Sequence, residues 1–209
     1  KFSICTASLF MLMSCVDLNL NPLSEGSSEN WYSSQAEIEM SLNDFYRTDF
    51  FPIDDMKWGD DVTARNETSA VNNGTLTSED GTIAKRWENY YKGIARALRI
   101  INNMDRARAM GVSERDIAQY EGEAYFYLGY AYGMLAFHWG DAILDKVGMS
   151  LDEAYTASRS PKADVLAYSY ECLDKAAERL PNSYPGIQRA TKGAAYAFKA
   201  RIAIYNEDY

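Results

Sequence analysis

The sequence has little cysteine and almost no histidine. Its 209 residues include three cysteines, Cys5, Cys15 and Cys172, and one histidine, His138. A structural zinc site needs about four His or Cys ligands, and a Ser-His-Asp relay needs a histidine among polar partners. Neither site has enough material here, so we expect no metal and no cofactor. His138 ends an apolar stretch, where a packed or helix-capping side chain is expected.

Positive charge is also scarce. The chain carries 21 Lys and Arg against 30 Asp and Glu, which gives a formal net charge of -9. A negative surface field repels phosphate backbones and anionic lipid headgroups, so nucleic-acid binding is not expected. Aromatic residues, by contrast, make up 13% of the chain. Such residues suit both helix packing and stacking on sugars, and packing is their usual role.

No hydrophobic run is long enough to predict a membrane-spanning helix, which needs about twenty apolar residues. The apolar stretch from Phe2 to Met13 follows Lys1 and precedes a small residue, and this pattern predicts an export signal over residues 1–14. The sequence Leu-Met-Ser-Cys, ending at Cys15, resembles a bacterial lipobox, in which signal peptidase cuts before the cysteine and the thiol is acylated. The alternative is an ordinary signal with a cysteine nearby. With Cys15 lipidated, the membrane is reached through the lipid anchor only, and Cys172 is left as an inert buried thiol.

Residues 15–33 are rich in Asn, Ser, Pro and Gly and predict a lipidated tether. Beyond the tether, apolar residues recur at helical spacing in five segments, 34–47, 83–110, 113–139, 160–180 and 191–205. Ser34, Ser113 and Thr191 are expected helix caps, and Ser160-Pro161 predicts a cap hydroxyl followed by proline at the first helical position. The segments 49–82 and 140–159 are expected to be irregular.

The expected fold is all-α. Residues 125–139 are apolar almost all round, which indicates a central buried helix. Helices of about fifteen to twenty-five residues with interleaved small and aromatic residues predict tetratricopeptide-like antiparallel helix pairs joined by long irregular loops. No strand pattern competes, and residues 34–209 form one helical domain.

Several segments, taken in order, resemble the SusD/RagB family of outer-membrane nutrient-binding lipoproteins from Bacteroidetes. They include the lipobox at Cys15 and the Asp-Leu-Asn-Leu-Asn-Pro run after it, the Trp-Tyr-Ser-Ser sequence from Trp31, Trp87 with Tyr90-Tyr91, residues 122–127, His138-Trp139-Gly140-Asp141, Ser158-Arg159-Ser160-Pro161, and residues 190–201. The likeness extends over nearly the whole chain. Family members are normally much longer, so the domain at 34–209 is expected to be truncated relative to the family.

The resemblance implies a surface-exposed outer-membrane lipoprotein. Such a protein captures glycans, or sometimes peptides, and sits as a lid over a SusC-like TonB-dependent transporter. On this reading the protein is not an enzyme, and its partners are the transporter and the glycan ligand. The alternative is a helical-repeat adaptor that binds only protein, since stacked helix pairs are common interaction surfaces.

The loop Met56 to Asn66 holds the expected ligand contacts. Trp58 offers a flat apolar face, and Asp61, Arg65 and Asn66 offer groups that bind sugar hydroxyls. The competing interpretation is that Trp58 anchors the loop in the core while Asp61 and Arg65 pair with each other.

The acidic residues of the same loop admit two further interpretations. Asp54, Asp55, Asp60 and Asp61 could act as paired carboxylates of a glycosidase or as calcium ligands. Sequence neighbours rarely reach the separation that a glycosidase needs, and no EF-hand pattern is present. A solvated acidic loop is therefore favoured over both.

Overall fold

The structure is a computed structural model that describes residues 31–32, 34–52 and 70–208. The chain divides into two units, Lys1–Trp31 and Tyr32–Tyr209, and the described residues of the second unit have an all-α fold, as predicted. Its helices are α1 (Gln35–Asn43), the short 3-10 helix η1 (Asp44–Tyr46), α2 (Gly81–Asn102), α3 (Met104–Ala109), α4 (Glu114–Trp139), α5 (Leu151–Thr156), α6 (Lys162–Arg179) and α7 (Lys192–Tyr205). Within these described ranges, pairing of the β type is limited to an isolated bridge between Ala142 and Ser160.

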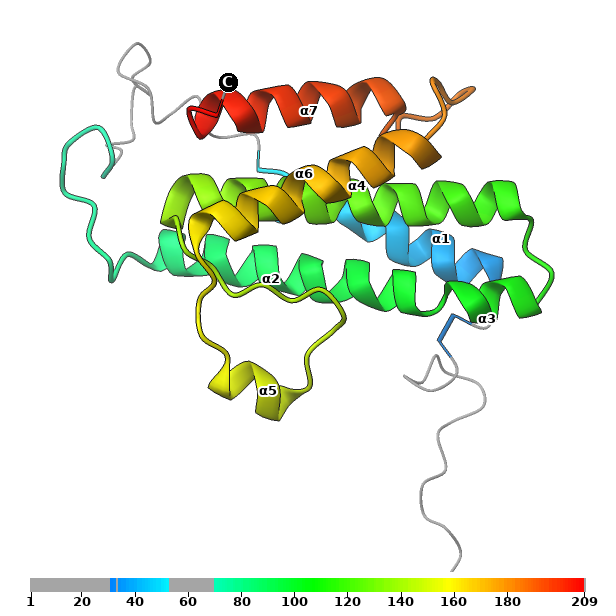
Figure 1. Ribbon diagram of the computed structural model, residues 1–209, viewed down its shortest axis with the longest axis horizontal. Helices are drawn as coiled ribbons and strands as arrows, with labels where there is room; N and C mark the ends of the chain where they lie inside the picture. The colour runs from blue at the N-terminus through cyan, green and yellow to red at the C-terminus, as the bar shows by residue number, and fades with distance from the viewer. Residues whose placement is uncertain (1–30, 33, 53–69, 209) are drawn as a thin grey trace, which may run out of the picture. The chain divides into compact units, whose positions relative to one another are not determined.

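The long helices of this unit alternate in direction. In Figure 1, α2 and α6 run one way, while α4 and α7 run the other. The central helix is α4, which packs most extensively on α6 and then on α2, and which also contacts α7 and α1. This arrangement confirms the predicted tetratricopeptide-like stack of antiparallel helices.

Helix α4 is central because its second half carries no charge. From Ala124 to Ala136, every residue except Tyr125 is buried. Glycines on this stretch allow the neighbouring helices to approach closely, and a Cβ atom added at Gly129 would lie 2.9 Å from the backbone oxygen of Ser169 in α6. The Ser169 hydroxyl donates a buried hydrogen bond of 2.6 Å to the Gly129 carbonyl oxygen, so the contact leaves no polar group unsatisfied.

Three of the predicted helix caps are confirmed. The side chains of Ser34, Ser113 and Thr191 accept bonds from backbone N–H groups in the first turns of α1, α4 and α7. The prediction for α6 is wrong in detail, because Pro161 is the cap residue and has no side-chain cap bond. The Ser160 backbone pairs with Ala142, and the Asp141 carboxylate instead accepts the Lys162 N–H at 2.8 Å.

One predicted helix and one predicted inward-facing residue are also wrong. The expected single helix over 83–110 is divided at Asn103, which follows α2 and precedes α3. The Asn103 side chain donates to the Arg99 carbonyl oxygen at 2.7 Å, and such local bonding competes with continuation of a helix. In the C-terminal helix, the helical spacing of Ala195, Phe198, Ile202 and Tyr205 predicts one inward face. Ala195 and Ile202 are buried as this spacing predicts, but Tyr205 is 40% exposed.

The 140–159 connection contains a helix that apolar periodicity did not predict. Helix α5 buries none of its residues and stands away from the helix stack in Figure 1. It forms locally, because Ser150 and Glu153 make a reciprocal capping box. Tyr132 and Tyr91 hold the base of this connection through hydroxyl bonds to the carbonyl oxygens of Asp145 (2.8 Å) and Ile143 (2.9 Å).

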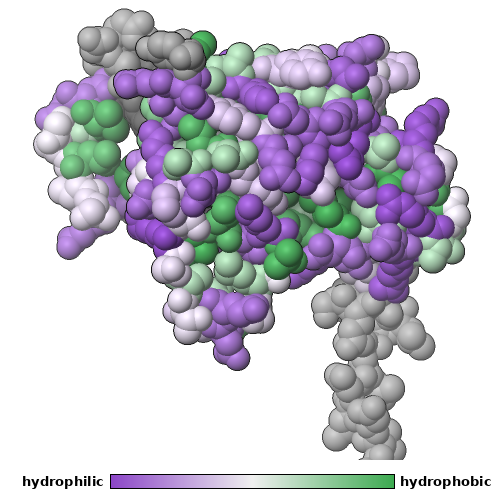
Figure 2. Space-filling view, in the orientation of Figure 1, coloured by the Kyte–Doolittle hydropathy of each residue, from purple (hydrophilic) through white to green (hydrophobic). Residues whose placement is uncertain are grey.

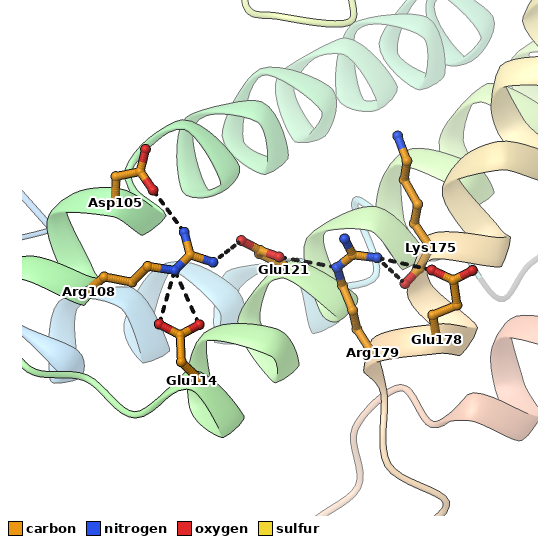
Figure 3. Close-up of polar contacts among 7 residues, drawn as sticks. All are labelled: Asp105, Arg108, Glu114, Glu121, Lys175, Glu178 and Arg179. Carbon is orange, nitrogen blue, oxygen red and sulfur yellow. Dashed lines mark hydrogen bonds and ion pairs between the residues drawn. The ribbon is translucent and has the colours of Figure 1, made fainter.

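A chain of ion pairs joins α3, α4 and α6 at one end of the stack (Figure 3). Glu121 of α4 lies between Arg108 of α3, at 3.0 Å, and Arg179 of α6, at 3.1 Å. Asp105 and Glu114 also pair with Arg108. Isolated exposed ion pairs contribute little to stability, but Glu121 is half-buried and shared by two guanidinium groups, so this network fixes how the three helix ends meet.

We expect Gly129→Ala to lower the free energy of unfolding by about 1–3 kcal/mol, because the added Cβ would press on Leu173 and on the Ser169 backbone of α6. Urea unfolding followed by circular dichroism measures this loss. Gly193→Ala is the matched control, since its Cβ meets its nearest atom at 3.9 Å. We expect this control to be neutral or to stabilise by up to about 1 kcal/mol. Equal effects of the two substitutions would contradict the close approach of α4 and α6.

Candidate functional site

The ligand contacts expected from the sequence lie outside the described residues. Trp58, Asp61, Arg65 and Asn66 fall in 53–69, and the expected lipidation site Cys15 falls in 1–30. The two remaining singled-out residues, His138 and Cys172, are described. His138 packs its ring against Phe137 and Trp139, with centroids 4.8 Å and 5.5 Å away. The Cys172 thiol is buried, and burial raises its pKa to about 12, so it is inert as expected.

The described residues form a hollow of ≈ 290 Å³ where η1, α4 and α7 meet. We call it the α7 hollow. Its lining is mostly aromatic, with a polar edge from the segment before α7, and consists of Tyr46, Phe51, Phe126, Gln188, Arg189, Ala190 and Phe198. Phe51 lies two positions before residues 53–69, the range that includes the predicted contacts. One lining residue of the hollow is therefore close in sequence to those contacts.

The aromatic wall of the hollow is continuous with the core. The Phe198 ring of α7 meets the edges of Phe126 and Tyr130, with both centroids 5.4 Å away. Phe51 packs on Tyr130 at 4.7 Å and edge-on against Tyr127 at 5.4 Å. Because edge-to-face pairs have preferred geometries, these contacts fix the orientation of the rings that face the hollow.

A buried carboxylate holds the polar edge of the hollow in place. Glu123 of α4 is 2% exposed, and its Oε2 accepts bonds from Arg189, at 2.8 Å, and from the Tyr46 hydroxyl, also at 2.8 Å. Gln119 donates to Oε1 at 3.1 Å. The Tyr46 oxygen in turn accepts the Ala190 N–H at 2.9 Å. Three segments that lie far apart in the sequence are thereby tied together.

The charges of this cluster compensate each other. Burial, followed by the nearby Glu123 carboxylate, raises the pKa of Tyr46 above its ordinary value, so the phenol stays protonated and donates. Arg189 also bonds the Asn43 side-chain oxygen. With its oxygens occupied by three donors, Glu123 is placed to anchor the segment before α7, whereas the hollow itself offers aromatic side chains and the Gln188 amide for binding.

The described part of the chain contains neither a metal-ligand cluster nor a helix that could span a membrane. No group of three or more His, Cys, Asp or Glu side chains there is placed to hold a metal ion. Among the described helices, none is both long and apolar enough to cross a membrane. The face in Figure 2 is largely hydrophilic, with hydrophobic residues in separate small patches.

Sequence reasoning did not find this site. Phe126 and Phe198 were expected as helix residues, and Arg189 was not singled out. The hollow combines residues from 46–51, from α4 and from 188–198, which come together only in the folded chain. The one local signal is the aromatic run at Phe50-Phe51, which lies in the segment 49–82 that the sequence predicts to be irregular.

Comparison with known proteins identifies the family. A family model described as "Starch-binding associating with outer membrane" matches residues 25–204. The chain belongs to the SusD-like family. The SusD/RagB resemblance of the sequence is therefore confirmed.

Individual relatives of this SusD-like chain are distant. "SusD-like protein P2" of Formosa agariphila is 23% identical over an alignment that covers 96% of this chain and 42% of that protein. A SusD-like protein from Bacteroides fragilis has a TM-score of 0.70 and 24% identity, covering 90% of this chain and 38% of its own. A structure determined with a xylogluco-oligosaccharide has a TM-score of 0.64 and 18% identity, covering 79% and 34%. The SusD-like chain thus spans less than half the length of these relatives.

We expect Glu123→Gln to lower the free energy of unfolding by about 3 kcal/mol, because Arg189, whose side chain is 13% exposed, loses its counter-charge. Thermal and urea unfolding measure the loss. The matched control is Glu178→Gln, which removes a 74% exposed partner of Arg179 and should change stability by less than about 1 kcal/mol. A loss no larger than that of the control would contradict the anchoring role of Glu123.

Proposed function

We propose that this chain is part of a cell-surface lipoprotein that binds glycans and delivers them to a SusC-type TonB-dependent transporter of the outer membrane. The family match over residues 25–204, with its description of starch binding and outer-membrane association, carries the proposal. A structural relative solved with a xylogluco-oligosaccharide adds support for a glycan as ligand. The function is binding and transfer, with no chemical change to the ligand.

Each predicted residue has a role in this proposal. The thiol of Cys15 carries the lipid that holds the protein at the outer membrane. Trp58 stacks on a sugar ring, while Asp61, Arg65 and Asn66 bind its hydroxyl groups. The helix stack serves as the rigid scaffold on which the binding loops are placed.

One observation favours a second candidate, a protein-binding adaptor without sugar affinity. Leu151 and Tyr155 on α5 are 70% and 80% exposed, and nearby Val147 is 73% exposed. Large apolar side chains so exposed on one short element are typical of protein contacts. Capture of a barrel partner by a chain that binds no glycan would favour this candidate.

Glycan binding is tested with the purified chain carrying Cys15→Ala. We expect affinity electrophoresis against a panel of neutral and charged polysaccharides, followed by calorimetry, to identify at least one ligand. Trp58→Ala should weaken its binding by about fivefold, since stacking on an aromatic face contributes on the order of 1 kcal/mol. Trp31→Ala removes an indole outside the predicted contact loop and is the control. Failure of the unaltered chain to retain any glycan or peptide of the panel would refute the proposed function.

Lipidation is tested in a bacterial host that processes lipoproteins. We expect labelled palmitate to enter the wild-type chain and to be absent from Cys15→Ala, because acylation takes place on this thiol. Cys5→Ala is the control, since Cys5 lies within the predicted signal and should leave labelling intact. Equal labelling of wild type and Cys15→Ala would show that the lipobox interpretation is wrong.

A further inference from the structure

We propose that the α7 hollow is a subsite for a single uncharged pyranose ring. The inference rests on the proposed function, because it assigns part of the glycan to a place that is separate from the predicted loop contacts at 58–66. Four properties of the hollow carry it: the arrangement of its rings, its size, its charge and its rigidity.

The rings of the hollow present apolar faces next to polar groups. Phe198, Phe126 and Phe51 supply the apolar wall, and Tyr46 is 41% exposed although its hydroxyl is bonded to Glu123. The C–H faces of a pyranose stack on such rings. Gln188 also lines the hollow and is exposed, and its amide both donates and accepts, as does a sugar hydroxyl.

The size of the hollow favours one ring over an oligosaccharide. Its volume of ≈ 290 Å³ is at the low end of the roughly 300–1,000 Å³ of pockets that enclose drug-sized ligands. Gln188 and Tyr46, which both line the hollow, are exposed to solvent, so the rest of a glycan chain can remain outside the hollow in solvent.

The charge of the hollow favours an uncharged sugar. Among the described residues of its lining, Arg189 carries the one positive charge, and that guanidinium is already engaged by the buried Glu123 carboxylate and by the Asn43 side-chain oxygen. A uronate or sulfate group would find little positive charge here, and it would approach a chain of net charge -9. A neutral pyranose is not subject to this repulsion.

The rigidity of the hollow suits a preformed site. The ring of Phe198 is held by Phe126 and Tyr130, and the polar edge is held by the Glu123 cluster. Little ordering of side chains is then required when a ligand enters, and this reduces the entropic cost of binding.

The experiment compares two variants of the hollow with a control on the same helix. Phe198→Leu keeps an apolar side chain but removes the flat ring. Gln188→Ala removes the side-chain amide from the polar edge and lies outside the helices. Tyr196→Ala removes an aromatic ring of α7 that is 57% exposed and does not line the hollow. Each variant is made in the chain carrying Cys15→Ala, and its folding is checked by thermal unfolding. Calorimetry then uses starch and xylogluco-oligosaccharide as neutral probes, with alginate and a sulfated carrageenan as charged probes.

We expect a neutral probe to bind, the charged probes to bind at least tenfold more weakly, and both hollow variants to weaken neutral binding by about five- to tenfold. Tyr196→Ala should leave the affinity unchanged.

If a glycan binds but neither hollow variant alters its affinity, the subsite is refuted while the proposed function stands. Tighter binding of a charged probe would refute the preference for neutral sugars. If the unaltered chain binds no glycan at all, the proposed function fails and the subsite fails with it. Gln188→Ala still decides the matter if Phe198→Leu does not fold, since Gln188 is exposed and outside the helices.

Discussion

Close packing on all sides of α4 is the constraint on which the rest of this structure depends. An apolar helix that meets α2, α6 and α7 at once can fit only where small residues let the backbones approach. Gly129 provides this toward α6, Gly133 faces Ile202 of α7, and Gly93 of α2 makes room for the Tyr127 ring. The direction of each neighbouring helix then follows from its connection to this centre, and the antiparallel order results.

The α7 hollow is a consequence of the same packing combined with one buried ion pair. The Phe198 ring reaches the hollow because α7 is seated against Gly133. The segment 188–190 lines the hollow because Glu123 holds Arg189 and Tyr46 holds the Ala190 N–H. A polar cluster of this kind contributes less through its net stability than through the single arrangement it enforces, since a shifted segment would leave the carboxylate buried without its partners.

Much of the fold followed from residue patterns, and the reasons for the misses are specific. Helical periodicity and hydroxyl caps located α1, α4 and α7, because those signals are local and act within a few residues. The boundary at Asn103 was missed because apolar periodicity continues through it while the Asn103 side chain bonds back to Arg99. Helix α5 was missed because it has no buried face and depends on a capping box alone. The family was also recognisable from its ordered segments.

The candidate site was far less accessible from sequence than the fold was. The pairing of Glu123 with Arg189 spans 66 positions and has no local signature. Nothing in the spacing of Tyr46, Phe126 and Phe198 indicates that their rings meet. Local sequence patterns do not reveal a site that forms only through tertiary contacts. The predicted ligand contacts therefore came from one continuous loop, Met56 to Asn66.

The isolated bridge between Ala142 and Ser160 has a consequence for how such proteins can diversify. Two backbone hydrogen bonds, of 3.2 Å and 2.8 Å, close the connection between α4 and α6 at its base, and Asp141 caps α6 from the same place. These contacts lie on both sides of the α5 segment and together fix the position of the first turn of α6. Changes in length or composition around α5 should therefore have little effect on the stability of the helix stack. The α5 segment can vary during evolution while the scaffold keeps its structure.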